Sequence, residues 1–529
     1  MIVDLETASS PDSYDCDIAI IGAGAVGLTT AVYLSRHGAN VMLLEAGGER
    51  LESRSQALFE GLDVGHPLTG MREGRFRMLG GTSNFWGGQL VRIDPSVIGG
   101  REWLDLDAWP ISNSELDPYY SVFAGLLGLP DISDAELHRQ LELDAVELDD
   151  DLEFAFSRWL RNPNLGQVFR GDIVGAALTT LIHANVVGFE AGPNRDGVRS
   201  VHVATLTGRR AQVRARRVVL ACGTLEISRL LMLPLLADPA GTRDTQPAPW
   251  ATNPWLGRGF MDHLDCYAGE VMVKEYARFH DLFDSAILGG FKYHTKLRLS
   301  QEGQERLKTL EVAGQFTFKS DYAEHIANLK LFIRSILSGR PPSNLSQLPS
   351  HIAALWKFGA PLAIRYIRSQ RVFTPGDAGV FLQLSAEQWP SADSTIRLAD
   401  VRDALNLPKV EVNWVIDGRE LETMAVFAER VRDFLNASGL ARLEIDPLLA
   451  ARDPKFLSNV RDFYHQMGGV RLADSPSRGV VDTNLKVFGC ENLFVAGAAV
   501  FPTAGYANPT LTAACLGLRL GDHLMSQGA

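Results

Sequence analysis

The 529-residue sequence has few cysteines and no long apolar run. Its five cysteines, at positions 16, 222, 266, 490 and 515, are an odd number without paired spacing, which indicates neither a disulfide framework nor a metal site. No apolar run approaches the roughly 20 residues of a membrane span. The acidic N-terminal stretch also lacks the basic and apolar regions of a secretory signal. We therefore expect a cytoplasmic protein.

Positive charge is also scarce, with 51 Lys and Arg against 63 Asp and Glu and a net charge of −12. Such a balance argues against nucleic acid as a partner, because phosphate binding needs clustered positive charge. A hydrophobic share of 46% is ordinary for a globular protein. The length predicts two sequential or intertwined domains.

A dinucleotide-binding fingerprint stands near the N-terminus. The β-branched run DIAII (17–21) leads into Gly22, Gly24 and Gly27 and then into a helical pattern. A second strand, expected over 40–44, ends at Glu45, which is placed to bind ribose hydroxyls. This pattern predicts a βαβ unit whose helix N-terminus binds a pyrophosphate, but it does not choose between NAD and FAD.

Two later segments favour FAD. Residues 75–88 (RFRMLGGTSNFWGG) form a loop with two glycine pairs, which suits a backbone lying against a flat ring. Residues 216–229 supply another apolar strand, which ends in the small-residue turn ACG and enters a helix. Recurring strand and turn far from the fingerprint are typical of one long cofactor that crosses a domain.

The third informative region is the segment 464–508, which places a histidine and an asparagine beside a glycine-rich run. A neutral His465 is suited to take a hydroxyl proton, and Asn508 can donate an amide N–H to the same oxygen. The alternative is that His465 is an ordinary buried histidine and Asn508 a turn residue before Pro509.

Six ordered blocks resemble the glucose-methanol-choline (GMC) oxidoreductase family. They are residues 20–47, GGTSNFWGG, VVLACGTLEISRLL, LGRGFMDH, PSADSTIRL and the C-terminal block. The likeness extends over nearly the whole chain and is greatest to the bacterial branch similar to pyranose oxidases and glucoside 3-dehydrogenases. It implies bound FAD and catalytic roles for His465 and Asn508.

The resemblance also assigns residues around the cofactor. It places the fingerprint residues on the ADP half, the glycine-pair loop near the flavin, and a third group on the adenine, the ribityl or pyrophosphate part and the pyrimidine edge. The cofactor residues are Gly22, Gly24, Ala25, Gly27, Glu45, Gly81, Ser83, Asn84, Gly87, Gly88, Val187, Gly497, Asn508 and Thr510. Phe85 stands where pyranose oxidases carry a histidine linked to the flavin, so we expect non-covalent FAD.

The predicted fold is mixed α/β, with a Rossmann-like FAD-binding domain and an interleaved substrate domain of sheet and helices. Residues 1–265 are expected to bind mainly FAD and 266–455 mainly substrate, and 456–529 return to the FAD domain. Strands are expected over 380–387, 395–398 and 410–415.

Substrate contacts are harder to predict from the sequence. Gln383 on the first of these strands, Tyr464 and Tyr506 are candidates, although each could equally be packing. His263 is a weaker candidate that could instead anchor the domain junction. The amphipathic segment 345–371 could form a packed helical pair, a lid, or a contact with a membrane, a redox partner or an acidic substrate.

We therefore predict FAD-dependent oxidation of a secondary or primary alcohol, on a sugar, glycoside or sugar-bearing natural product. The alternatives are a non-sugar aliphatic or terpenoid alcohol, or a non-redox lyase or photodecarboxylase that keeps FAD. The electron acceptor is left open between oxygen, a quinone and a redox protein.

Overall fold

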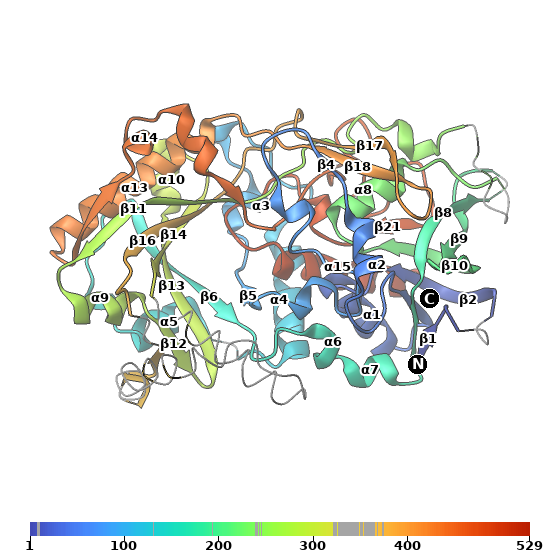
Figure 1. Ribbon diagram of the computed structural model, residues 1–529, viewed down its shortest axis with the longest axis horizontal. Coiled ribbons are helices and arrows are strands. Elements are labelled where there is room, and N and C mark those ends of the chain that lie inside the picture. Colours follow the sequence, from blue (N-terminus) through green and yellow to red (C-terminus); the bar gives the residue numbers. More distant parts are fainter. Residues whose placement is uncertain are drawn as a thin grey trace.

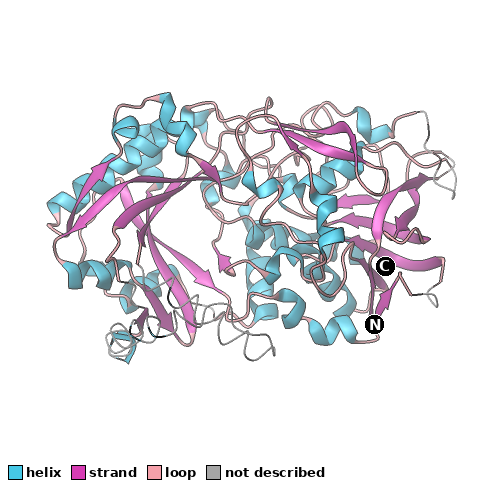
Figure 2. Ribbon diagram, in the orientation of Figure 1, coloured by secondary structure: helices cyan, strands magenta, loops and turns pink. Residues whose placement is uncertain are grey.

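The computed structural model describes residues 1–7, 11–130, 132–192, 194–237, 242, 244, 246–320, 325, 349, 353, 365–367, 369–372 and 375–528. Two large sheets lie towards opposite ends of the long axis of the molecule (Figure 1). Helices lie beside both sheets, and long loops fill much of the region between them (Figure 2). The mixed α/β fold predicted from the sequence is confirmed.

Within the described residues, the first sheet has eight strands in the order β1-β7-β3-β2-β10-β9-β8, with β21 beside β10. The strands are β1 (Ile2–Asp4), β2 (Ser13–Ile21), β3 (Val41–Leu44), β7 (Leu178–Ile182), β8 (Asn185–Ala191), β9 (Val198–Ala204), β10 (Arg210–Leu220) and β21 (Leu493–Val495). β10, which contains the predicted strand at 216, pairs in parallel with both β2 and β21. Three segments distant in sequence therefore end at one edge of the sheet.

The helix that follows the fingerprint packs against the last helix of the chain. α1 (Ala25–Arg36) and α15 (Thr510–Ser526) meet through two glycines. A Cβ on Gly517 would lie 2.4 Å from the Thr30 hydroxyl oxygen, and one on Gly521 would lie 3.0 Å from the Tyr33 ring. The absence of side chains at these glycines allows the close approach of the two helices.

The second sheet has ten described strands, of which seven follow the order β15-β12-β13-β14-β16-β11-β19. They are β5 (Gln89–Leu90), β6 (Leu152–Trp159), β11 (Leu264–Val273), β12 (Ser285–Leu288), β13 (Phe291–Leu299), β14 (Val312–Phe318), β15 (Arg371–Val372), β16 (Val380–Ala386), β19 (Ala441–Ile445) and β20 (Arg461–Asp462). β6 pairs with β13, so a segment from the range assigned mainly to FAD binding belongs to this sheet.

The two faces of the second sheet differ. On one face, α13 (Arg419–Ala437) covers β14 and β16, where a Cβ on Gly314 would lie 2.6 Å from Phe427 and 2.9 Å from Leu382. Side chains alternate along a strand, so Gln383 lies on the other face, opposite Gln315 in the register. That face carries polar side chains.

Two strands that the sequence placed with the substrate domain lie elsewhere. β17 (Thr395–Arg402) and β18 (Pro408–Asn413) form a small sheet with β4 (Leu62–Asp63). β17 contacts α8 (Thr224–Met232), the helix that follows β10. Their apolar alternation correctly indicated strands, but it carries no information on which partner they join.

The remaining helices are short, apart from α4 (Asn113–Leu127), which begins with a capping box at Ser112 and Glu115. They are α2 (Ser53–Gln56), α3 (Pro95–Gly99), α5 (Asp134–Gln140), α6 (Leu165–Val168), α7 (Arg170–Val174), α9 (Tyr276–Phe283), α10 (Gln301–Leu307) and α14 (Pro447–Ala450).

Most of the amphipathic segment 345–371 lies outside the described residues, so the alternatives for it stay predictions. In the part of the chain that is described, no helix combines the length and apolar character that crossing a bilayer requires.

Candidate active site

The turn between β2 and α1 leaves an open cradle at the start of a helix. Gly22 has a φ of +104°, and a Cβ there would lie 2.7 Å from the Ala221 carbonyl oxygen. A Cβ on Gly27 would lie 1.9 Å from the Gly22 carbonyl oxygen, so both positions need glycine. A Cβ on Gly24 would meet no atom within 4 Å. The N-terminus of α1 therefore borders open space, where its N–H groups favour a phosphate.

Glu45 braces this turn. Its carboxylate accepts hydrogen bonds from the backbone N–H groups of Ala23, at 3.0 Å, and Gly47, at 2.8 Å. Burial raises the pKa of Glu45, and these two bonds and the charge of Arg77 oppose that change. Each carboxylate oxygen has further acceptor capacity, which suits hydroxyl donors from a ribose.

The glycine-pair loop lies directly on the fingerprint turn. A Cβ on Gly81 would lie 2.9 Å from the Gly24 Cα. The Ser83 hydroxyl donates to the Gly80 carbonyl at 2.6 Å, and the Asn84 amide donates to the carbonyls of Leu79 and Gly81 at 3.0 and 2.8 Å. The loop is thus held by its own side chains and leaves its backbone beside the cradle.

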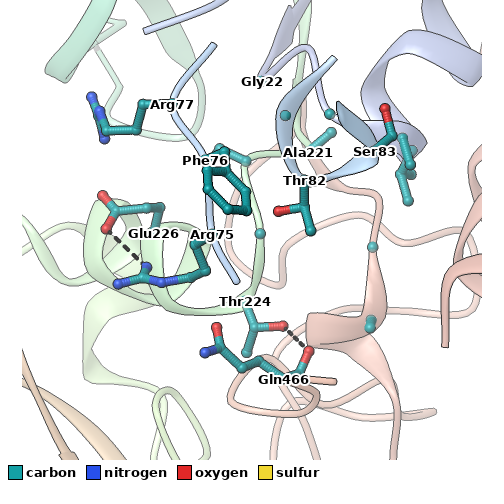
Figure 3. Close-up of a pocket in the computed structure, with 18 of the residues that line it drawn as sticks. Gly22, Arg75, Phe76, Arg77, Thr82, Ser83, Ala221, Thr224, Glu226 and Gln466 are labelled. Carbon is teal, nitrogen blue, oxygen red and sulfur yellow. Dashed lines mark hydrogen bonds and ion pairs between the residues drawn. The ribbon is translucent and has the colours of Figure 1, made fainter. Parts of the chain in front are cut away.

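These segments line a common pocket (Figure 3). On another side, the ACG turn and the start of α8 contribute Thr224, whose hydroxyl donates to the Gln466 carbonyl at 2.7 Å. Arg75 Nη1 and Glu226 Oε1 form an ion pair at 3.7 Å. The predicted residues that line the pocket are Gly22, Gly24, Ala25, Glu45, Gly81, Ser83, Tyr464, His465, Gly497 and Thr510.

Other predicted cofactor residues lie behind this lining. Gly87 and Gly88 pack against Trp159 and Pro163, where a Cβ would come within 2.5 and 2.8 Å of those side chains. On β8, Val186 lines the pocket, whereas the predicted Val187 does not. Gly27, Asn84 and Asn508 also lie outside the lining. For these residues the structure offers packing or hydrogen bonding, and direct cofactor contact stays a prediction.

His465 and Asn508 meet at the pocket. The Asn508 side-chain nitrogen lies 3.0 Å from His465 Nε2, and His465 itself borders the pocket. The His465 ring stacks on Phe463, with 5.3 Å between centroids and 6° between planes. Although 43 residues separate His465 and Asn508 in sequence, the fold brings their side chains into direct contact.

The backbone of this segment is fixed by a buried acid that the sequence analysis missed. Asp262 Oδ1 accepts hydrogen bonds from the backbone N–H groups of Phe463, at 3.1 Å, and His465, at 2.9 Å. Asp262 is fully buried, and burial raises its pKa. The Asp262 backbone N–H in turn donates to Gln388 at 2.9 Å. The catalytic histidine predicted from the sequence therefore has a rigid attachment on its enclosed side.

Electrostatics keep His465 neutral. Enclosure of the ring is the main cause that lowers its pKa well below the usual value, and the neighbouring His263 and the Lys296 ammonium lower it further. Lys296 is itself buried, which lowers its pKa to about 8. A neutral imidazole is the form that can accept a proton.

The three substrate candidates lie in different surroundings. Tyr464 is 47% exposed and borders the pocket. Tyr506 is buried, and its backbone N–H donates to Glu311 at 3.0 Å. Gln383 donates to Asp265 at 2.7 Å and accepts from Gln315 and Thr317, on the polar face of the second sheet. Of the three, only Tyr464 reaches the described pocket.

Sequence reasoning also missed individual residues of the pocket lining. Phe59, Phe76 and Glu226 line the pocket, and the last two lie within the segments 75–88 and 216–229 without having been singled out there. Cys222 also lines the pocket, and burial raises the pKa of its thiol. Arg77 lies in the lining and donates to Asn185 at 2.7 Å. The available signal was the charge of Arg77 within a glycine-rich loop.

Comparisons with known proteins agree with this geometry. Residues 17–244 match a family model described as FAD dependent oxidoreductase, and residues 390–517 match one described as GMC oxidoreductase. The chain is 24% identical to 6'''-hydroxyparomomycin C oxidase of Streptomyces lividus, over 97% of this chain and 92% of that protein. Its 28% identity to the fructose dehydrogenase large subunit of Gluconobacter japonicus covers 28% of this chain and only 25% of that protein.

A solved structure supports the fold. Pyridoxine 4-oxidase from Mesorbium loti superposes with a TM-score of 0.59 at 17% identity, over 96% of this chain and 99% of that one. The match of residues 17–244 to the FAD dependent oxidoreductase model, on a fold shared with a solved oxidase, indicates an FAD-dependent oxidoreductase. Its C-terminal segment matches the GMC oxidoreductase model, in agreement with the family resemblance that the sequence blocks predicted.

Proposed function

We propose that this oxidoreductase oxidises an alcohol group of a sugar, glycoside or sugar-bearing natural product, with His465 as base. The observation that carries the proposal is the 3.0 Å separation of His465 Nε2 and the Asn508 amide nitrogen, beside a pocket that begins at the fingerprint turn. A proton acceptor and a hydrogen-bond donor are thereby directed at one point.

The residues present fit FAD. The N-terminus of α1, next to Gly24, suits the pyrophosphate, and Glu45 suits a ribose. Gly81, Ser83, Gly497 and Thr510 line the rest of the pocket. Bound FAD supplies the acceptor for the hydride that leaves the alcohol carbon. We propose that the first sheet carries this cofactor and that the polar face of the second sheet borders the substrate.

The protein side of the reaction follows from the two catalytic candidates. His465 Nε2 takes the hydroxyl proton as the hydride departs, so the alcohol loses two electrons and two hydrogens and becomes a carbonyl. The Asn508 amide donates to the same oxygen and stabilises its developing negative charge without competing for the proton. His465 then releases its proton before the next turnover.

The sugar assignment rests on two supports. One relative is named for oxidising 6'''-hydroxyparomomycin C, an aminoglycoside, and another for dehydrogenating fructose. On the second sheet, Gln383, Gln315, Thr317 and Asp265 form a hydrogen-bonded polar cluster, which suits a ligand rich in hydroxyl groups.

A panel of alcohols tests this function. Under anaerobic conditions, sugars and glycosides are expected to bleach the flavin absorbance, whereas aliphatic diols and terpenoid alcohols of matched concentration are not. Bleaching only by the non-sugar alcohols would replace the proposed substrate class. Turnover without any flavin bleaching would instead indicate a lyase. Admitting air then distinguishes oxygen, if colour returns, from a quinone or redox protein, if colour returns only when that acceptor is added.

We further propose that FAD is bound without a covalent link. Phe85, at the position aligned with the linking histidine of pyranose oxidases, has no ring nitrogen, is 56% exposed and stacks on Phe76 at 4.1 Å between centroids. Denaturation in acid or urea should therefore release all of the yellow colour into the filtrate. Colour that remains on the polypeptide, with a mass increase equal to FAD, would contradict this prediction.

The cytoplasmic location also stays a proposal. All five cysteines are free, as a reducing compartment would keep them.

A further inference from the structure

His263 stands directly behind the base. It is fully buried, immediately before β11, and its Nδ1 lies 2.9 Å from His465 Nδ1. The two rings meet edge to face, with 5.0 Å between centroids and 83° between planes. A backbone bridge between Met261 and Met467 holds the two segments together. The backbone therefore keeps the segments that carry His263 and His465 next to each other.

Two nitrogens at hydrogen-bond distance share one proton, so one Nδ1 must donate and the other must accept. The Asn508 amide nitrogen has only hydrogens to offer, and it faces His465 Nε2 at 3.0 Å. Nε2 therefore carries the lone pair and Nδ1 carries the proton of a neutral His465. By this count, His263 Nδ1 is the acceptor.

The far side of His263 favours the same arrangement. No described residue offers His263 Nε2 an acceptor in good hydrogen-bond geometry, yet the Gly505 carbonyl stabilises the protonated ring. A carbonyl oxygen beside the ring favours a hydrogen rather than a lone pair on the nitrogen that it faces. With its hydrogen on Nε2, a neutral His263 presents the lone pair of Nδ1 to His465.

Burial is the main reason that both rings are neutral at rest. Burial lowers the pKa of His263 to about 4; Gly505 and the Glu387 carboxylate oppose this change, and the Lys296 ammonium adds to it. The pKa of His465 is lowered first by the same burial and then by His263 and Lys296. Asp262 Oδ1 accepts hydrogen bonds from backbone N–H groups of the His465 segment, and Oδ2 has no hydrogen-bond partner among the described residues.

We infer that His263 is a positioning residue for the base, which holds His465 in the tautomer whose Nε2 lone pair faces the substrate oxygen. The inference rests on the proposed role of His465. When His465 takes a proton at Nε2, its Nδ1–H already has an acceptor, so the ring need not turn. Because the acceptor is neutral, it supports the imidazolium without trapping it as a carboxylate would, and the proton leaves readily after turnover.

Three variants at one position test this role: His263→Asn, His263→Leu and His263→Asp. The Asn side-chain oxygen can occupy the place of Nδ1, and Leu has a similar size without an acceptor. Anaerobic stopped-flow reduction of the FAD enzyme, with a sugar that reduces the wild type, gives the limiting rate. We expect His263→Leu to lower this limiting rate about 10- to 100-fold, which is part of the rate enhancement that a positioned base contributes. The rate of His263→Asn should stay within about threefold of the wild-type rate.

The pH profile separates positioning from simple packing. The wild-type rate should stay level as the pH falls through 6.5, because His465 remains neutral. In His263→Asp the new carboxylate should raise the pKa of His465, so the rate should fall at a pH at least about one unit higher than in the wild type. The inference would be overturned by equal reduction rates for His263→Leu and the wild type, or by a pH profile of His263→Asp that is not shifted from that of the wild type.

The outcomes also separate this inference from the proposed function. If His465→Ala keeps normal flavin reduction, the proposed base is wrong and the inference fails with it. If His465→Ala is slow while His263→Leu is normal, only the inference fails. Should the Leu variant not retain FAD, the Asn rate and the Asp profile still decide.

Discussion

Replacement of His465 by alanine should slow the reduction of FAD by substrate about a thousandfold while leaving the cofactor in place. The magnitude lies within the range of about 10²–10⁴ that a positioned general base contributes. The cofactor should remain bound because the cradle at Gly24 and the carboxylate of Glu45 are formed without His465. Anaerobic stopped-flow absorbance measures the rate, and the flavin-to-protein absorbance ratio measures occupancy.

A matched control for this variant is His37→Ala. His37 is exposed at the end of α1, where its ring contacts only the Tyr33 carbonyl among described hydrogen-bond partners. Its loss should leave the reduction rate unchanged. A normal rate in His465→Ala would remove that residue from the role of base, whereas a slow rate with lost flavin would indicate a structural effect instead.

Replacement of Arg101 by leucine should destabilise the protein by about 3–5 kcal/mol, the usual result of breaking a buried ion pair on one side. Arg101 and Glu387 are both fully buried, and the two terminal guanidinium nitrogens of Arg101, Nη1 and Nη2, contact the carboxylate. Burial alone would raise the pKa of Glu387, but the charge and hydrogen bonds of Arg101 hold that pKa below its usual value. Without Arg101, the carboxylate must stay charged at high cost or take up a proton.

The double variant Arg101→Leu/Glu387→Leu removes both charges. It therefore separates the free energy cost of leaving one buried charge unpaired from the stabilisation lost with the ion pair itself. It should recover much of the stability, because no buried charge is left uncompensated. The exposed pair of Arg36 and Asp172 gives the control, and Arg36→Leu should change stability by less than about 1 kcal/mol. Denaturant unfolding of the FAD enzyme compares the free energies of unfolding of these variants with that of the wild type. An Arg101→Leu variant as stable as the Arg36→Leu control would contradict the prediction.

The fingerprint was predictable because its constraints are local. Gly22 is required by its positive φ and Gly27 by the Gly22 carbonyl oxygen a few residues away, and such local requirements leave fixed spacings in the sequence. The fold class, the FAD dependence and the family were likewise predicted correctly. The pairing of His465 with Asn508 was anticipated from the family pattern, and their side chains do meet.

Long-range contacts left no such pattern. Asp262 holds the backbone of His465 across about two hundred residues, and His263 does the same for its ring. Nothing periodic distinguishes a buried acid that accepts backbone bonds from one that faces solvent. For the same reason, the sequence showed that residues 395–398 form a strand but not that β17 joins β4 and β18 instead of the second sheet.

The helix pair α1 and α15 has a consequence for how such enzymes diversify. Asn508 stands two residues before α15, and that helix is locked by Gly517 and Gly521 onto the helix that begins at the pyrophosphate cradle. The proposed hydrogen-bond donor therefore shares one rigid body with the fingerprint turn and keeps its position when the distant polar sheet is altered. We expect substitutions at Gln383 and Gln315 to change which alcohol is accepted, while the proposed reaction chemistry stays unchanged.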